Sequence, residues 1–229
     1  MVRYLVKGNR TVVRMPALRG LPVSRLLHIS ASPRGAASES LAIAGTFLDA
    51  YRDVHGDVVD HFDLWDGTLP AFGPAGAGAK MAVFAGEDPS GEQAAAWRAA
   101  RAVFDRFASY DRYLFSVPMW NSGIPYVLKQ FIDVISQPGW VFRFDPEKGY
   151  TGLLHGKKAA VVCTSAVYGD GRPPAFGRDH QVPFLDGWLR WTGITDIAGI
   201  EFRPNLAVAD AGAGRRAAHA EARELGKRF

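Results

Sequence analysis

The spacing of hydrophobic positions divides the chain into alternating strands and helices. Short runs that are apolar, or that alternate apolar and polar residues, predict five strands. They cover residues 25–30, 57–64, 113–117, 158–165 and 194–202. Apolar residues at helical spacing predict a helix after each strand. These helices cover residues 38–55, 90–109, 127–135, 182–192 and 209–226.

A strict alternation of strand and helix predicts one doubly wound α/β domain with a parallel sheet. Five strands fit the order 2-1-3-4-5, which is the order of flavodoxin-like folds. Residues 65–90, rich in glycine and proline, are expected to form a long loop that serves as a lid or pocket wall, with one helical turn over 81–84. Residues 137–144 are expected to be extended, and residues 145–156 irregular.

In this strand order the carboxyl ends of strands one, three and four enclose the ligand crevice of the sheet. The three most distinctive loops, at residues 32–40, 118–125 and 165–171, follow those three strands. The sequence therefore predicts a binding site built from these loops.

Composition limits the range of functions. The chain has 229 residues and a net charge of +4. Residues 1–25 hold six of the 27 basic residues and no acidic residue, so the remaining 21 face 23 acids, a net charge of −2. The basic excess thus belongs to the N-terminus, and nucleic-acid binding loses its support.

The N-terminal segment is interpreted apart from the rest. Residues 1–24 are expected to be a basic, poorly ordered extension, and residues 25–229 the folded domain. A transit peptide and an upstream start codon, with Met15 as the alternative start, both remain open. No apolar run approaches the roughly 18 residues of a membrane helix. The single Cys163 excludes an intramolecular disulfide and favours a reducing, cytoplasmic setting.

The loop after the first strand has the chemistry of an anion site. Ser32, Ser38 and Ser40 offer hydroxyls beside the free N–H groups of a helix N-terminus. No glycine pattern of a dinucleotide or triphosphate site is present. The loop therefore favours a monophosphate on a small cofactor, although a capped helix after a polar turn would have the same sequence.

The second and third loops add groups suited to a flat ligand. Met119 and Trp120 can line an aromatic ring, and Asn121 can donate and accept hydrogen bonds at its rim. A core tryptophan at a strand end is an equally good interpretation of that loop alone. In the third loop, Thr164, Ser165 and the residues up to Gly169 can supply hydroxyls and backbone N–H groups.

Other chemistries have little support. The sequence has no nucleophile elbow of a serine hydrolase and no histidine or cysteine spacing of a metal site. Cys163 and His28 lie on strands and are expected to be interior residues. Asp170 and Arg172 are expected to be solvated loop charges.

The order of motifs resembles that of the FMN-dependent NADH:quinone and azo reductases, which have the flavodoxin-like fold. The match runs through residues 118–125, Leu128-Lys129, Asp133, residues 142–144 and residues 156–159. It covers residues 25–205 and is strongest over 113–165.

The resemblance implies an FMN site with the following assignments. The hydroxyls of Ser32, Ser38 and Ser40 would hold the phosphate, with Glu39 where the family often has glutamine. Pro118, Met119, Trp120, Asn121 and Ser122 would lie along the isoalloxazine ring. The third loop would close the pyrimidine edge through Thr164, Ser165, Ala166, Tyr168 and Gly169.

The resemblance also implies a ping-pong oxidoreductase in which FMN performs the chemistry and no side chain is a required acid or base. NADH or NADPH would be the donor, and a quinone, azo or nitro aromatic compound the acceptor. A homodimer with active sites at its interface is implied as well. Trp120 replaces a tyrosine of the family, and Ala166-Val167 replace two glycines. Three alternatives follow: a reductase specialised for one biosynthetic substrate, a flavodoxin-like electron carrier, and a relative without cofactor.

Overall fold

The computed structural model describes residues 24–229 except residues 57 and 207. The predicted extension at residues 1–24 therefore lies, apart from residue 24, outside the described residues. The main sheet has five parallel strands in the order β2-β1-β3-β6-β7, which confirms the predicted order 2-1-3-4-5. The strands are β1 (Arg25–Ser30), β2 (Val58–Asp63), β3 (Arg112–Pro118), β6 (Lys158–Thr164) and β7 (Asp196–Phe202).

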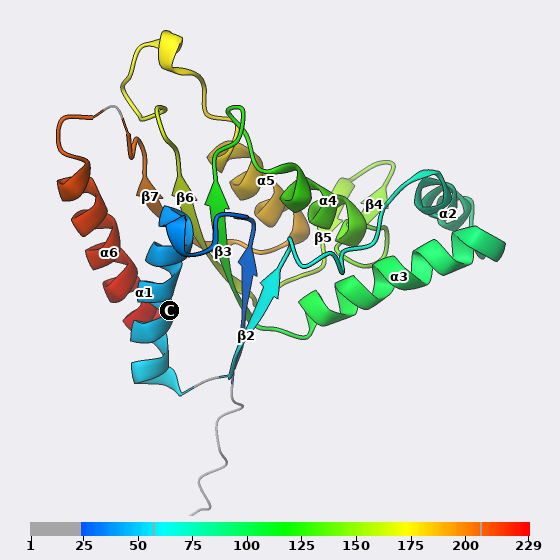
Figure 1. Ribbon diagram of the computed structural model, residues 1–229. Helices are drawn as coiled ribbons and strands as arrows, with labels where there is room; N and C mark the ends of the chain where they lie inside the picture. The colour runs from blue at the N-terminus through cyan, green and yellow to red at the C-terminus, as the bar shows by residue number, and fades with distance from the viewer. Residues whose placement is uncertain (1–23, 57, 207) are drawn as a thin grey trace, which may run out of the picture.

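Helices cover both faces of this sheet, as expected for a doubly wound fold (Figure 1). One face carries α1 (Glu39–His55) and α6 (Ala211–Arg228). The other face carries α3 (Gly91–Ala108), α4 (Tyr126–Ile135) and α5 (Val182–Thr192). The central strands are apolar along most of their length because they contribute to a core on each side.

Residues 65–90 are more regular than predicted. They contain helix α2 (Pro74–Phe84), whereas the sequence predicted a loop with one turn. Pro74 presets the first turn, and the alanines between the glycines favour a helix. A Cβ on Gly76 would lie 2.9 Å from Phe72, and one on Gly78 would lie 2.6 Å from the side chain of Gln93. These glycines therefore permit close packing against their neighbours, and they do not break the helix.

A second departure lies between α4 and β6. Strand β4 (Phe142–Asp145) pairs in antiparallel fashion with β5 (Gly149–Gly152), where the sequence predicted an irregular connection after residue 144. The Asp145 carboxylate accepts the N–H groups of Glu147 and Lys148, each at 2.9 Å, and closes the turn. This hairpin lies outside the main sheet, on the side of α4 and α5 (Figure 1).

The remaining elements are two short 3₁₀ helices, η1 (Gly35–Ala37) and η2 (Pro174–Phe176). Both lie in loops at the carboxyl edge of the sheet, η1 after β1 and η2 after β6. Among the helices that the structure describes, none has the length and hydropathy needed to cross a membrane.

Candidate functional site

The three loops selected from the sequence lie next to one another. They follow β1, β3 and β6, which are consecutive neighbours in the sheet. The N–H of Ala31 donates to Ser116 at 3.0 Å, and the N–H of Met119 donates to Thr164 at 2.7 Å. Hydrogen bonds thus join the base of each loop to the adjacent strand, and the three loops form one continuous rim.

The first loop gathers its hydroxyls at the start of α1. Ser32, Ser38 and Ser40 are buried, and the oxygens of Ser38 and Ser40 are 3.1 Å apart. Ser38 also caps α1, because its hydroxyl accepts the N–H of Leu41 at 3.3 Å. Hydroxyls and free N–H groups at a helix N-terminus are the donor set that suits a phosphate.

Glu39 has different partners from those serines. Its carboxylate accepts hydrogen bonds from Arg215 of α6, one of them 3.0 Å long. The hydrogen bond from Arg215 lowers the pKa of Glu39. The residue therefore stays charged, and it fastens α6 to the start of α1 next to the serine hydroxyls.

The second loop makes a tight turn after β3. The backbones of Trp120 and Gly123 exchange two hydrogen bonds of 2.9 Å each. Between them, Asn121 and Ser122 have φ angles of 49° and 69°, in the left-handed region. Asparagine tolerates this region better than most residues. Pro118 ends β3, and the half-buried Met119 leads from it into the turn.

The turn places Trp120 beside two other aromatic rings. Its ring centroid is 5.6 Å from that of Trp65 and 6.2 Å from that of Tyr126. The side chain is 36% exposed. Together with its neighbours it borders an open groove of about 460 Å³. The lining residues are Trp120, Asn121, Gly123, Ile124, Tyr126, Lys129, His180 and Phe184.

The third loop is fastened to the end of β7. The N–H of Ser165 donates to Phe202, and the N–H of Leu206 donates to Ala166 at 2.9 Å. A Cβ on Gly169 would lie 2.4 Å from Pro204, so this position is in close contact and requires glycine. Thr164 and Ser165 are buried, whereas Ala166 is exposed.

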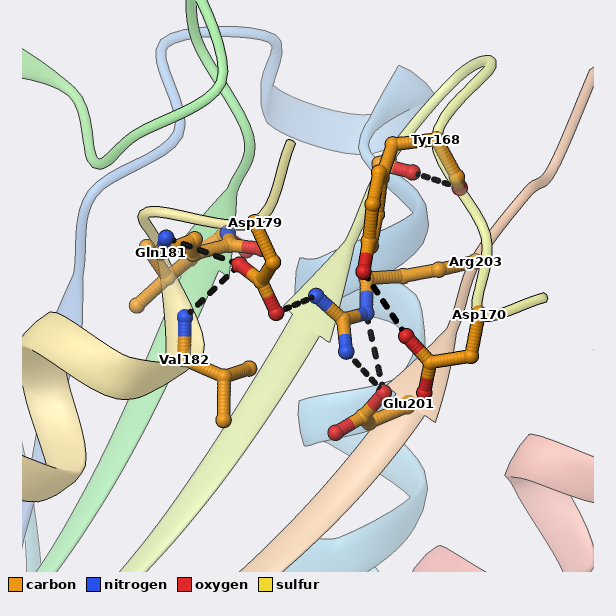
Figure 2. A network of polar contacts seen from close by, with 9 residues as sticks. Tyr168, Asp170, Asp179, Gln181, Val182, Glu201 and Arg203 are labelled. Carbon is orange, nitrogen blue, oxygen red and sulfur yellow. Dashed lines mark hydrogen bonds and ion pairs between the residues drawn. The ribbon is translucent and has the colours of Figure 1, made fainter. Parts of the chain in front are cut away.

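Some residues at this rim have contacts that the sequence did not predict. Asp170 is exposed, as predicted, and it also accepts the Tyr168 hydroxyl at 2.8 Å (Figure 2). Arg203 and Asp179 lie beneath the same loop and were missed, because 24 residues separate the two members of this ion pair. Trp65 was also missed; its position two residues after the end of β2 was the available signal.

His28 and Cys163, which the sequence predicted to be interior residues, are both buried. Burial lowers the pKa of His28 to about 3, with smaller effects of His61 and Arg52, so its ring is neutral; it lies 3.0 Å from the Ser116 hydroxyl. Burial raises the pKa of the Cys163 thiol. Within the described part of the chain, no group of acidic, histidine or cysteine side chains is arranged to hold a metal.

The donor chemistry fits a ligand with a phosphate at one end and a flat ring at the other. The phosphate would lie at the hydroxyls and N–H groups of the first loop. The ring would lie along Met119 and Trp120, between the second and third loops. Flavin mononucleotide has a phosphate at one end and a flat isoalloxazine ring at the other, and neighbouring loops offer groups suited to each.

Comparisons with known proteins agree with this assignment. The family model described as having a flavodoxin-like fold matches residues 24–225. An FMN-dependent NADH:quinone oxidoreductase of Ruegeria pomeroyi is 47% identical over 195 residues, 84% of this chain and 95% of the relative. A second FMN-dependent NADH:quinone oxidoreductase, from Pseudomonas syringae pv. tomato, is 42% identical over 87% of this chain and 96% of its own length.

The crystal structure of an azoreductase from Bacillus anthracis has a TM-score of 0.82 and 26% identity, and the alignment covers 90% of this chain and 100% of that one. These matches confirm the resemblance drawn from residues 118–159 and the class of enzyme, an oxidoreductase. The chain belongs to the family of FMN-dependent NADH:quinone oxidoreductases, which has the flavodoxin-like fold.

Proposed function

We propose that this protein transfers reducing equivalents from NADH or NADPH through bound FMN to a quinone or azo acceptor. The observation that carries the proposal is the rim of three loops on the adjacent strands β1, β3 and β6. The first loop offers hydroxyl and N–H donors for a phosphate, and the second offers an aromatic wall. The backbone of the third loop is hydrogen-bonded to the end of β7. Relatives named for the same activity, 42% and 47% identical, support it.

The protein's own residues bind and orient. Ser32, Ser38 and Ser40, with the first N–H groups of α1, would hold the phosphate. Trp120 would lie along the flavin ring, and the Asn121 carboxamide would reach its polar edge. Bound FMN supplies the hydride and electron chemistry itself. The described rim therefore needs no general acid or base.

The groove beside Trp120 suits a flat acceptor. Its volume of about 460 Å³ lies within the range of small-molecule sites. Tyr126 and Phe184 provide aromatic walls, and Lys129 also lines the groove. We propose that aromatic acceptors, including nitro aromatic compounds, stack there against Trp120.

We further propose that the active protein is a homodimer with its sites at the interface, in the cytoplasm. Two large aromatic residues that line the groove are exposed, Tyr126 by 63% and Phe184 by 37%. A second groove of about 550 Å³ shares Tyr126 and Lys129 with the first. Exposed apolar patches of this kind mark interaction surfaces. The lone, buried Cys163 is compatible with a reducing compartment.

Sedimentation of the Tyr126→Glu variant tests the dimer. The charge should convert the protein to monomer and lower its activity, since Tyr126 borders both grooves. Val54→Glu is the matched control, because Val54 is 57% exposed on α1, on the opposite face of the sheet. A Tyr126→Glu variant that remains a fully active dimer would contradict this arrangement.

The decisive test of the main proposal is direct. The purified protein should be yellow, and it should oxidise NADH or NADPH with a quinone as acceptor. A colourless protein that cannot be reconstituted with FMN would overturn the proposal. Assays with both nucleotides and a panel of acceptors would then define the preferred donor.

A reductase specialised for one biosynthetic substrate is the second candidate. It is favoured by Trp120, where the family resembled by this chain has tyrosine, and by the exposed Ala166 and Val167, where that family has two glycines. Fast reduction of the flavin by nucleotide, without turnover of simple quinones, would support it. Absence of reduction by either nucleotide would instead indicate an electron carrier.

A further inference from the structure

We propose that Arg203 is a positioning residue that holds the second and third loops of the flavin site in their relative places. This inference rests on the proposed function. Arg203 follows β7 directly, and its side chain is only 3% exposed (Figure 2). A buried guanidinium is costly unless it is fully paired, so its partners define its role.

The first partner is Asp179, whose side chain is 14% exposed. The Nη1 of Arg203 donates to Asp179 Oδ2 at 2.6 Å. The other oxygen, Oδ1, accepts the N–H groups of Gln181 at 2.8 Å and Val182 at 3.1 Å, at the start of α5. Arg203 thereby fixes the segment that leads into α5.

The second partner of the Arg203 guanidinium is Glu201. The Nε of Arg203 donates to Glu201 at 2.9 Å, and Nη2 contacts the same carboxylate. Burial alone would lower the pKa of Arg203, but the hydrogen bonds that Arg203 donates to both carboxylates raise it. The cation is therefore permanent.

The segment held by Asp179 supports the second loop. The N–H of His180 donates to the carbonyl of Ser122 at 2.8 Å, and the Gln181 side chain donates to the carbonyl of Val117 at 2.9 Å. Ser122 has a φ of 69°, which is unfavourable for serine and persists only where neighbouring contacts hold it. The bond from His180 is such a contact.

Arg203 supports the third loop on its other side. Its Cζ lies 5.2 Å from the centre of the Tyr168 ring, within the range of a cation–π contact. The Tyr168 hydroxyl donates to Asp170, and its carbonyl accepts the Ser165 hydroxyl. Figure 2 shows the ring of Tyr168 beside the arginine, while Asp179 lies on the opposite side. One buried cation thus connects the two loops.

The test compares Arg203→Met with Arg190→Met. Arg190 forms an exposed pair with Asp186 at 2.8 Å, on α5, and serves as a matched loss of an ion pair away from the loops. The readouts are the dissociation constant for FMN, the visible circular dichroism of the bound flavin, and KM and kcat for a quinone. Arg203→Met should weaken FMN binding at least tenfold and change the dichroism, whereas Arg190→Met should change neither.

A conservative variant and a second site keep the result interpretable. Arg203→Lys retains the charge and should recover part of the FMN affinity. If Arg203→Met does not fold, Asp179→Asn decides, since it keeps the shape and the oxygen that accepts from α5. Unchanged FMN affinity and dichroism in the variant that folds would overturn the role of Arg203. Failure of the unmodified protein to bind FMN would instead overturn the proposed function.

Discussion

Trp65 and Trp120 lie with their ring centroids 5.6 Å apart, tilted by 45°. The indole N–H of Trp65 also donates to the carbonyl of Ala31 at 3.0 Å. Trp65 therefore joins the first loop, which begins at Ala31, to the second loop, which carries Trp120. An aromatic residue after an edge strand thus connects the serine-rich loop to the turn that carries Trp120.

Two substitutions of Asn121 should distinguish the effect of its backbone conformation from the effect of its carboxamide. The residue has a φ of 49°, which costs alanine about 1 kcal/mol but costs glycine little. Asn121→Ala and Asn121→Gly should both weaken FMN binding or slow hydride transfer, because both lack the carboxamide. Only the alanine variant should also unfold at lower denaturant concentration without FMN. FMN affinity and hydride-transfer rates that match those of the unmodified protein in both variants would contradict the placement of Asn121 at the ring edge.

Substitution of Ser40 should distinguish FMN from riboflavin. The Ser40 hydroxyl is fully buried beside Ser38, and a hydrogen bond to a charged group contributes about 1.5–3 kcal/mol. Ser40→Ala should therefore weaken FMN binding about tenfold to a hundredfold. Riboflavin, which lacks the phosphate, is the internal control and should bind both proteins equally. Equal losses for the two ligands would place the phosphate elsewhere.

The pair of Glu39 and Arg215 should modulate the same phosphate. Arg215→Gln leaves the Glu39 carboxylate unpaired beside the serine hydroxyls, so FMN should bind about fivefold more weakly at low salt. Glu39→Gln removes the negative charge and should not weaken binding. The double variant should return close to the unmodified protein. Titrations of flavin fluorescence at two salt concentrations measure the FMN affinity of all three variants. Identical affinities in the variants and the unmodified protein would mean that the pair only joins α6 to α1.

The neutral His28 should make folding stability depend on pH. Its pKa is about 3 in the folded protein and about 6.5 in an unfolded chain, so the unfolded state binds more protons between these values. The stability is complete above pH 6.5 and declines by about 1.4 kcal/mol per pH unit as the pH falls toward 3. Between pH 6.5 and 5 this amounts to about 2 kcal/mol.

Urea unfolding at several pH values measures this effect. His28→Gln should flatten the acid side of the stability profile, because glutamine does not titrate. His155→Gln, at an exposed histidine, is the control and should leave the slope unchanged. Parallel profiles for His28→Gln and the unmodified protein would show that protons bind elsewhere.

The sequence predicted the sheet well because burial on both faces gives its central strands a recognisable run of apolar residues. The three central strands are buried on both faces and are therefore apolar runs, and Ser38 marks the start of α1 as a cap. Helix α2 was missed because glycine and proline usually end helices. Here Gly76 and Gly78 serve close packing, which depends on residues that only the fold brings near.

The candidate site was predictable where it lies directly after a strand. All three loops could be located in this way, and the serines of the first loop lie together as expected. The binding roles of these residues remain predictions. Arg203 could not be found, since Asp179 is 24 residues away in sequence and nothing local marks either residue as buried. Long-range ion pairs of this kind are visible only in the folded chain.

The fastening of the third loop has a consequence for how this enzyme can change. Residues 166–168 form an arch that is held at both ends. Ala166 accepts a hydrogen bond from the N–H of Leu206, and Gly169 packs closely against Pro204. Ala166 and Val167 are exposed, so their side chains can vary while Tyr168 keeps its contacts with Arg203 and Asp170. A laboratory evolution library aimed at new acceptors should therefore randomise Ala166 and Val167 and keep Tyr168 and Gly169, because substitutions at the two exposed positions should cost little folding stability.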